Sequence, residues 1–118
     1  MISNDVLEHV PDIKTAFDES HRTLKQGGTL MFSVPFTHAA KTERRAEMAG
    51  DELKLPKEAV YHGNPVSSGG SLVFYDFGWD IIDICKESGF SDVYMAAYFC
   101  KTRAHLSYGP LFMFVAEK

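Results

Sequence analysis

Apolar residues return at helical spacing in the first third of the chain. Ile13, Phe17 and Leu24 fall on one side of a helix, and the charged residues between them point away. Gly27-Gly28 follows, and glycine suits the left-handed residue that often comes after a last helical turn. The pattern therefore predicts an amphipathic helix over residues 11 to about 26.

Short apolar runs elsewhere in the chain predict strands. Thr29–Phe36 follows the helix directly and is largely apolar, which is typical of a strand covered on both faces in a parallel sheet. Met1–Asp5 would supply the strand before the helix, and Val93–Cys100 and Leu111–Ala116 would supply two more. Helices that alternate with buried strands indicate the α/β class, with a right-handed crossover between the first two strands.

The middle of the chain carries weaker patterns. Lys41–Leu53 is charged and could form a helix. Tyr61–Ser71 contains Asn64-Pro65 and Gly69-Gly70, and it predicts a long loop of the kind that often serves as a lid or substrate loop. Asp76–Glu87 predicts a second helix. Three of its apolar residues would share one face: Phe77, Ile81 and Cys85.

Composition limits the functions that the chain can have. Its 118 residues suffice for one small domain, and 45% hydrophobic against 24% charged residues is the balance of a folded protein. The net charge of -4 argues against nonspecific nucleic-acid binding, which needs a broad basic surface. No apolar run approaches the length of a membrane span, and Cys85 and Cys100 are expected to be reduced. We therefore expect a cytoplasmic protein with no nucleic-acid or membrane partner.

Two segments carry a resemblance to a known family. Asp5–Asp12 reads D-V-L-E-H-V-P-D and Leu24–Gly28 reads L-K-Q-G-G, with Gln26 where that family usually has proline. Together they resemble the centre of the class I S-adenosylmethionine-dependent methyltransferases, and Tyr61–Phe90 resembles one branch of them. The family's sheet has the strand order 3-2-1-4-5-7-6. The resemblance implies a partial Rossmann-like sheet of strands 4, 5, 7 and 6, flanked by helices, with the last strand antiparallel.

The part of that family's domain that binds the cofactor has no counterpart in this sequence. No G-x-G occurs in the 118 residues, and Gly27-Gly28 follows a helix, the reverse of the order that a cofactor loop requires. The expectation is a single truncated methyltransferase-like domain over residues 1–118, with Met1 an internal residue of the family's fourth strand. The family's cofactor, S-adenosylmethionine, is then not expected to bind to this chain alone.

The resemblance also implies where ligands would bind. In the family, the end of the fourth strand meets the methionine end of the cofactor. That position assigns cofactor contact to four residues: Ser3, Asn4, Asp5 and Leu7. Residues after the fifth strand and in the long loop would contact a small-molecule acceptor: Phe36, His38, Tyr61, His62 and Asn64. The alternative for both groups is a capped strand end and an ordinary polar loop.

His9 is the candidate for catalysis, because an imidazole can act as a general base near neutral pH. Many methyltransferases need only hold the nucleophile and the methyl group in line, so helix capping or loop packing is the alternative for His9. The five histidines, at positions 9, 21, 38, 62 and 105, show no i, i+4 pair and no cysteine at ligand spacing. The sequence therefore predicts no metal site.

Two functions follow from a truncated methyltransferase domain. The first is a fragment of an enzyme that transfers a methyl group to a small-molecule acceptor, inactive alone. The alternative is a non-catalytic, dimeric interaction module derived from half a methyltransferase. A nicotinamide-binding Rossmann half fits less well, because Asp5–Val10 and Leu24–Gly28 follow the methyltransferase pattern. An exposed edge of the fourth strand, or an apolar face beside it, predicts a homodimer.

Overall fold

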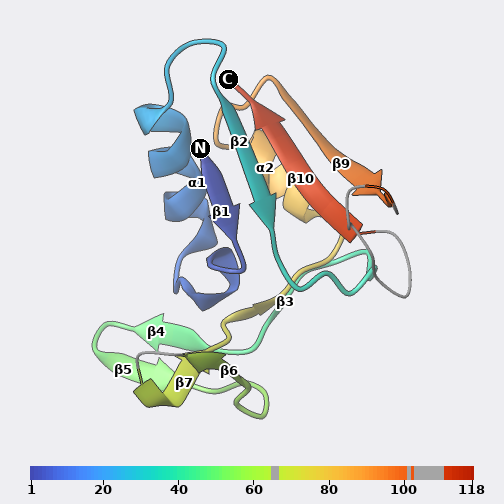
Figure 1. Ribbon diagram of the computed structural model, residues 1–118. Helices are drawn as coiled ribbons and strands as arrows, with labels where there is room; N and C mark the ends of the chain where they lie inside the picture. The colour runs from blue at the N-terminus through green and yellow to red at the C-terminus, as the bar shows by residue number, and fades with distance from the viewer. Residues whose placement is uncertain (65–66, 101, 103–110) are drawn as a thin grey trace.

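A mixed sheet forms the centre of the computed structural model, which describes residues 1–64, 67–100, 102 and 111–118 (Figure 1). In spatial order the strands are β1 (Ile2–Asn4), β2 (Thr29–Ser33), β10 (Leu111–Glu117) and β9 (Asp92–Tyr98). β1 runs parallel to β2, and β10 runs antiparallel to both of its neighbours. Each of the four segments predicted as strands therefore contains a strand, and the α/β class is confirmed.

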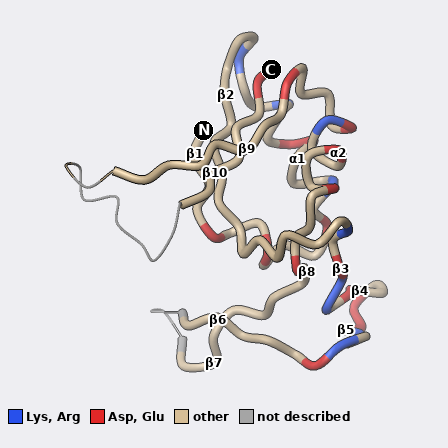
Figure 2. The backbone as a smooth tube through the Cα atoms, turned by 90° about the vertical axis from the view of Figure 1, so that its right-hand side faces the viewer, with Lys and Arg blue, Asp and Glu red and all other residues tan. Residues whose placement is uncertain are grey.

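Both α-helices lie against the same face of this sheet, as the turned view shows (Figure 2). α1 (Ile13–Thr23) is shorter than the predicted 11 to 26. Asp12 caps its start by accepting a hydrogen bond from the Thr15 N–H at 3.1 Å, and the helix ends early because the backbone of Leu24 is extended. The second helix, α2 (Ile81–Lys86), also begins later than predicted. Every helix in the described residues is too short to serve as a membrane span.

The core lies between the sheet and these helices. Phe17 of α1 packs against Phe32 of β2 with ring centroids 5.3 Å apart, and Phe32 stacks on Phe114 of β10 at 5.2 Å. The three residues predicted to share a face are all completely buried: Phe77, Ile81 and Cys85. Burying an aromatic side chain of this size contributes about 2–3 kcal/mol, so this cluster is the main source of stability.

The helix considered for Lys41–Leu53 is wrong, because the segment forms short strands. These are β3 (Glu43–Arg44), β4 (Glu47–Ala49) and β5 (Glu52–Lys54). Met48 and Leu53 are 40% and 43% exposed, so the segment has no buried apolar stripe to hold a helix against the core. Glycine at position 50 supplies a φ of +65°, which closes the β4–β5 hairpin tightly.

The long loop predicted over Tyr61–Ser71 is also wrong. Strands β6 (Tyr61–Asn64) and β7 (Ser67–Leu72) pair as an antiparallel hairpin on the side of the molecule away from the main sheet (Figure 1). Gly70, which predicted a turn, lies inside β7, and only glycine fits there because a Cβ would approach the His62 carbonyl oxygen to 2.7 Å. The hairpin carries no alternating apolar pattern, so its strands could not be predicted from periodicity.

The segment after this hairpin joins it to the rest of the fold. Strand β8 (Tyr75–Asp76) pairs with β3, which corrects the prediction of a helix starting at Asp76. Arg45 donates to the Asp76 carboxylate at 2.7 Å, and the contact raises the pKa of the Arg45 guanidinium. Phe77 then forms a bridge with Phe36, just beyond β2.

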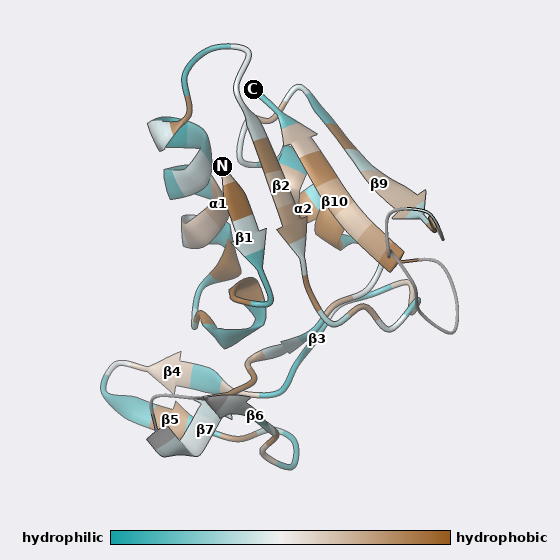
Figure 3. Ribbon diagram, in the orientation of Figure 1, coloured by the Kyte–Doolittle hydropathy of each residue, from teal (hydrophilic) through white to brown (hydrophobic). Residues whose placement is uncertain are grey.

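One face of the main sheet has no helix against it. Register places Ile2, Met31, Val115 and Tyr94 in one row across this face, from β1 to β9. Ile2 is 76% exposed, and strongly hydrophobic positions run along β1, β2 and β10 (Figure 3). Among the described residues β1 pairs only with β2, so its outer edge carries backbone groups without a strand partner.

Candidate functional site

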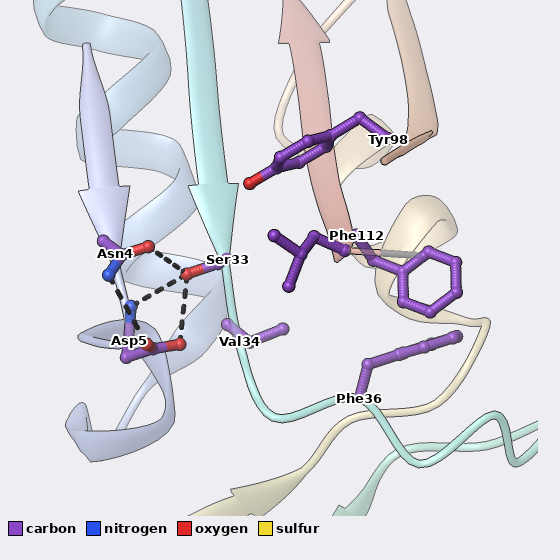
Figure 4. A pocket seen from close by; sticks show the side chains of 8 residues that line it. Asn4, Asp5, Ser33, Val34, Phe36, Tyr98 and Phe112 are labelled. Carbon is purple, nitrogen blue, oxygen red and sulfur yellow. Dashed lines mark hydrogen bonds between the residues drawn. The ribbon is translucent and has the colours of Figure 1, made fainter. Parts of the chain in front are cut away.

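A cavity of about 330 Å³ opens at the ends of β1 and β2 (Figure 4). Its lining comes from the four strands of the main sheet and from the segments that follow β1 and β2: Asn4, Asp5, Ser33, Val34, Phe36, Tyr98, Leu111 and Phe112. In α/β sheets, ligands bind beyond the carboxyl ends of the parallel strands, where side chains from neighbouring strands converge. This cavity occupies that position, because β1 and β2 run parallel and end together.

One wall of the cavity is a polar network between the ends of β1 and β2 (Figure 4). The Ser33 hydroxyl lies 2.6 Å from Asn4 Oδ1 and 3.0 Å from Asp5 Oδ1, so it can donate to either oxygen. The Asp5 N–H donates back to Ser33, to its carbonyl oxygen at 3.1 Å and its hydroxyl at 3.3 Å. The network fixes the direction of the Asp5 carboxylate while leaving the side chain exposed to a ligand.

The backbone at this site is held in an unusual conformation. Asp5 has φ of 50° and His38 has φ of 60°, the two non-glycine residues with positive φ in the part of the chain described. Such conformations cost free energy, and they concentrate where a side chain must take one particular direction. Asp5 lines the cavity. The His38 ring packs against the rings of two lining residues, with centroids 4.7 Å from that of Phe36 and 5.5 Å from that of Phe112.

The opposite wall of the cavity is aromatic. Phe36 lies edge-on to Trp79 with centroids 4.9 Å apart and edge-on to the core residue Phe114 at 5.5 Å, so its ring is firmly positioned. Tyr98 directs its hydroxyl across the cavity toward β2 (Figure 4). A carboxylate and an amide on one side and aromatic rings on the other suit a ligand with one charged and one apolar end.

Only some of the residues that the sequence assigned to ligands line the cavity. Asn4, Asp5 and Phe36 line the cavity, and His38 lies directly behind it. Two residues assigned to the cofactor do not line the cavity: Ser3, which pairs with Phe32, and Leu7, which is buried in the core. Two assigned to the acceptor lie on β6 outside the lining: Tyr61 and His62. The side chain of Asn64 is outside the described residues.

His9 also lies away from the cavity, in the short 3-10 helix η1 (Leu7–His9). Its Nδ1 lies 2.8 Å from the Leu72 carbonyl oxygen, and its ring meets that of His62 edge-on at 5.1 Å. Both imidazoles approach the carboxylate of Glu8, which is completely buried. The sequence spacing of the histidines predicted no such group, because 53 positions and a hairpin separate His9 from His62.

Sequence reasoning missed five of the eight residues that line the cavity. Ser33, Tyr98 and Phe112 stand at strand ends, and polar or aromatic residues at strand ends were a usable signal for Ser33, which aligns with Asn4 in the parallel pair. Tyr98 and Phe112 could not be placed from the pattern. They reach the cavity only because β10 inserts between β2 and β9, an order that depends on the whole sheet.

Known proteins resemble this chain in sequence and in fold. A sequence profile of the methyltransferase domain family matches residues 1–32. The solved structure of a protein described as an S-adenosylmethionine-dependent methyltransferase from Mesorhizobium loti matches 99% of this chain, with 20% identity and a TM-score of 0.56. The resemblance to the class I methyltransferases is confirmed.

The methyltransferase likeness has a definite extent. The sequence match covers β1, η1, α1 and most of β2, and the shared fold extends the likeness over the rest of the chain. The chain spans 60% of the length of the Mesorhizobium loti protein. No curated protein matches the chain in sequence.

Proposed function

We propose that this chain forms one wall of a methyl-transfer site in a class I methyltransferase. Strands β1, β2, β9 and β10 would be the family's fourth, fifth, sixth and seventh strands, since their order and the antiparallel β10 fit that assignment. The cavity at the ends of β1 and β2 is the observation that carries the proposal. It lies next to the segment matched by the methyltransferase family profile.

In this proposal the polar wall meets the methyl donor. S-adenosylmethionine, when bound, supplies a methyl group on a positively charged sulfur. The Asp5 carboxylate, oriented by Ser33, attracts the positive charge of the donor's amino-acid end, and Asn4 accepts or donates hydrogen bonds beside it. Fixing that end in one direction is what positions a methyl group for in-line attack.

The aromatic wall would meet the acceptor. Phe36, with His38 behind it, and Tyr98 present apolar surface that excludes water from one side of the cavity. A small acceptor with an apolar or aromatic body suits this wall. His9, Tyr61 and His62 lie outside the cavity and take no part in the proposed transfer.

We further propose that the chain alone holds the donor weakly. The described sheet ends at β1, and the cavity is open to solvent beyond its polar and aromatic walls, so a donor would keep much of its surface in water. A second wall is needed for tight binding, and β1 offers the edge for it. A homodimer through this edge or through the Ile2–Met31 face is one source of that wall, and the observation that favours it is the 76% exposure of Ile2.

A non-catalytic interaction module is the second candidate, because the same exposed edge and face suit a partner without any chemistry. The two candidates differ in whether the cavity binds the donor. The test is a titration of the isotopically labelled chain with S-adenosylhomocysteine, the donor without its methyl group, followed by amide chemical shifts.

We expect Kd in the millimolar range and shifts at Asn4, Asp5 and Ser33. Asp5→Asn keeps the shape and the tolerance of positive φ but removes the charge, and should weaken binding at least about fivefold, which corresponds to one charge-assisted hydrogen bond. Asp51→Asn removes an exposed carboxylate from the β4–β5 turn and serves as the control. Equal binding by wild type and Asp5→Asn would contradict the role of the Asp5 carboxylate, and no shifts at all would favour the interaction module.

A further inference from the structure

A second group of functional side chains lies outside the cavity, where η1 meets the β6–β7 hairpin. We propose that Glu8, His9 and His62 form a binding site for a divalent transition-metal ion of the zinc class. One carboxylate oxygen and one nitrogen of each histidine all lie within 4.8 Å of one another. The site is independent of the proposed methyl transfer, and it stands or fails on its own observations.

Glu8 is the residue that most requires a partner. Its side chain is completely buried, and neither carboxylate oxygen has a hydrogen-bond partner among the described residues. A buried carboxylate in that condition is costly, and such groups are normally paired or coordinate a metal. Glu8 Oε1 lies 3.6 Å from His9 Nε2 and 3.5 Å from His62 Nδ1, which is beyond hydrogen-bond distance.

His9 presents a lone pair to this carboxylate. Its Nδ1 lies 2.8 Å from the Leu72 carbonyl oxygen, and because a carbonyl only accepts, Nδ1 carries the proton. In the neutral ring, Nε2 then has no hydrogen to donate to Glu8. A histidine that donates its other N–H to a backbone carbonyl is the usual arrangement for a metal ligand, since the bond fixes the tautomer and the ring direction.

The distances suit a tetrahedral ion. Zinc lies about 2.0–2.2 Å from imidazole nitrogen and carboxylate oxygen, which puts neighbouring ligands of a tetrahedral site about 3.4 Å apart. The two separations from Glu8, 3.5 and 3.6 Å, are close to that value. Two imidazoles favour zinc and its transition-metal neighbours over magnesium, which prefers oxygen ligands.

The surroundings leave room for a further ligand and give the ion a structural effect. The His62 side chain is 39% exposed, so solvent reaches the site and can supply water to the remaining position. The site would join η1 to the β6–β7 hairpin. A backbone contact already lies beside it, because the N–H of Phe74, just after the hairpin, donates to the Glu8 carbonyl oxygen at 2.7 Å. Metal binding is therefore expected to stabilise the fold, because the unfolded chain does not hold the three ligands together.

The test uses the full chain and zinc alone. Calorimetry and metal analysis after dialysis should find one Zn²⁺ per chain, and Zn²⁺ should raise the Tm. His62→Ala should weaken binding at least about tenfold and remove the rise in Tm, since it removes one of three ligands. His21→Asn, which removes an imidazole on α1 away from both the cavity and the proposed site, is the matched control and should bind like the wild type.

A measurement on the wild type avoids any loss of fold in the variants. Histidine ring nitrogen shifts should move on zinc addition at His9 and His62, while those of His21 and His38 stay in place. Equal zinc binding by wild type and His62→Ala, shifts at other histidines, or no zinc retained would overturn the site. Binding of Mg²⁺ in preference to Zn²⁺ would overturn the assignment to the zinc class.

Discussion

The Ser33 hydroxyl lies 2.6 Å from Asn4 Oδ1 and so ties together the ends of two strands that are 29 residues apart in the chain. The same hydroxyl reaches Asp5, so one side chain fixes the direction of both polar residues of the cavity. A backbone ladder alone would align β1 with β2 without orienting these side chains.

Replacing Ser33 by alanine should therefore affect ligand binding more than stability. The exposed hydrogen bonds to Asn4 and Asp5 contribute about 1 kcal/mol together, so the free energy of unfolding should fall by no more than that. S-adenosylhomocysteine should bind at least about threefold more weakly, because Asp5 loses its fixed direction. Ser91→Ala, which removes an exposed hydrogen bond to Glu117, is the control for stability, and binding unchanged in Ser33→Ala would contradict the role of the network.

The cap of α1 gives a prediction with a pH dependence. The hydrogen bond from the Thr15 N–H lowers the pKa of Asp12 below 3.8. The folded state thus holds the proton less tightly than the unfolded chain, so the cap stabilises the fold above pH 3.8 and the contribution is lost as the pH falls below that value.

Asp12→Ala should lower the free energy of unfolding at pH 7 by about 1 kcal/mol, and Asp12→Asn by less, because asparagine also caps helices. Urea unfolding at pH 7 and pH 3 measures both effects. The difference between wild type and Asp12→Ala should shrink at pH 3. A difference that grows at low pH would contradict the cap.

Gly78 is required by space rather than by turn geometry. A Cβ at this position would lie 2.5 Å from the Lys41 carbonyl carbon and 2.6 Å from the Ala39 carbonyl oxygen, and both are backbone atoms. Gly78→Ala should lower the free energy of unfolding by at least about 2 kcal/mol, because the 39–41 segment must move away from the new methyl group at position 78. At Gly69 a Cβ would meet nothing within 4 Å, so Gly69→Ala should lower the free energy of unfolding by less than about 1 kcal/mol. Thermal unfolding of both variants measures the difference. Equal losses would show that the two segments are not packed as described.

The two cysteines should differ in reactivity. Burial raises the pKa of the Cys85 thiol to about 12, whereas Cys100 is half-buried at the end of β9. Since folding holds the Cys85 proton more tightly, this contribution to stability is complete below pH 9 and is lost as the pH rises toward 12. At pH 8 a thiol reagent should label Cys85→Ser protein, through Cys100, at least tenfold faster than Cys100→Ser protein. Rapid labelling of folded Cys100→Ser protein would contradict the burial of Cys85.

The exposed edge of β1 predicts self-association. Ile2 is 76% exposed and lies beside Met31 on the face without a helix. We expect a dimer at micromolar concentration in sedimentation, and Ile2→Lys should shift it to the monomer, because a charge on an edge strand opposes pairing. Arg22→Ala, a charged surface change on α1, should leave the association unchanged. A wild-type chain that stays monomeric at high concentration would contradict the predicted dimer.

The elements with strong local patterns could be predicted from the sequence. α1 has a buried apolar stripe, and β2 and β10 are apolar runs, so the local pattern alone was sufficient. The β4–β5 and β6–β7 hairpins could not be predicted, because their strands are short, polar and mostly exposed. The β3–β8 pair depends on contacts made far along the chain, such as that of Arg45 with Asp76, which no local pattern records.

Some residues of the candidate site could likewise be predicted from a local motif, and others could not. Asn4 and Asp5 were found because they lie in a recognisable motif at the end of a strand. Tyr98 and Phe112 become neighbours of Asp5 only through the strand order of the sheet. The Glu8 group depends on a hairpin that the sequence presented as a loop, so its histidines appeared unrelated.

The binding position of S-adenosylhomocysteine on the chain is the most direct test of the proposed methyl-transfer wall. Intermolecular nuclear Overhauser effects at millimolar ligand should connect its amino-acid end with the Asn4 side-chain amide and its sulfur-flanking protons with the ring of Phe36. That result would establish the cavity at the ends of β1 and β2 as the donor site. Contacts confined to the β6–β7 hairpin, or the absence of any contact at saturating ligand, would contradict the proposed methyl-transfer wall.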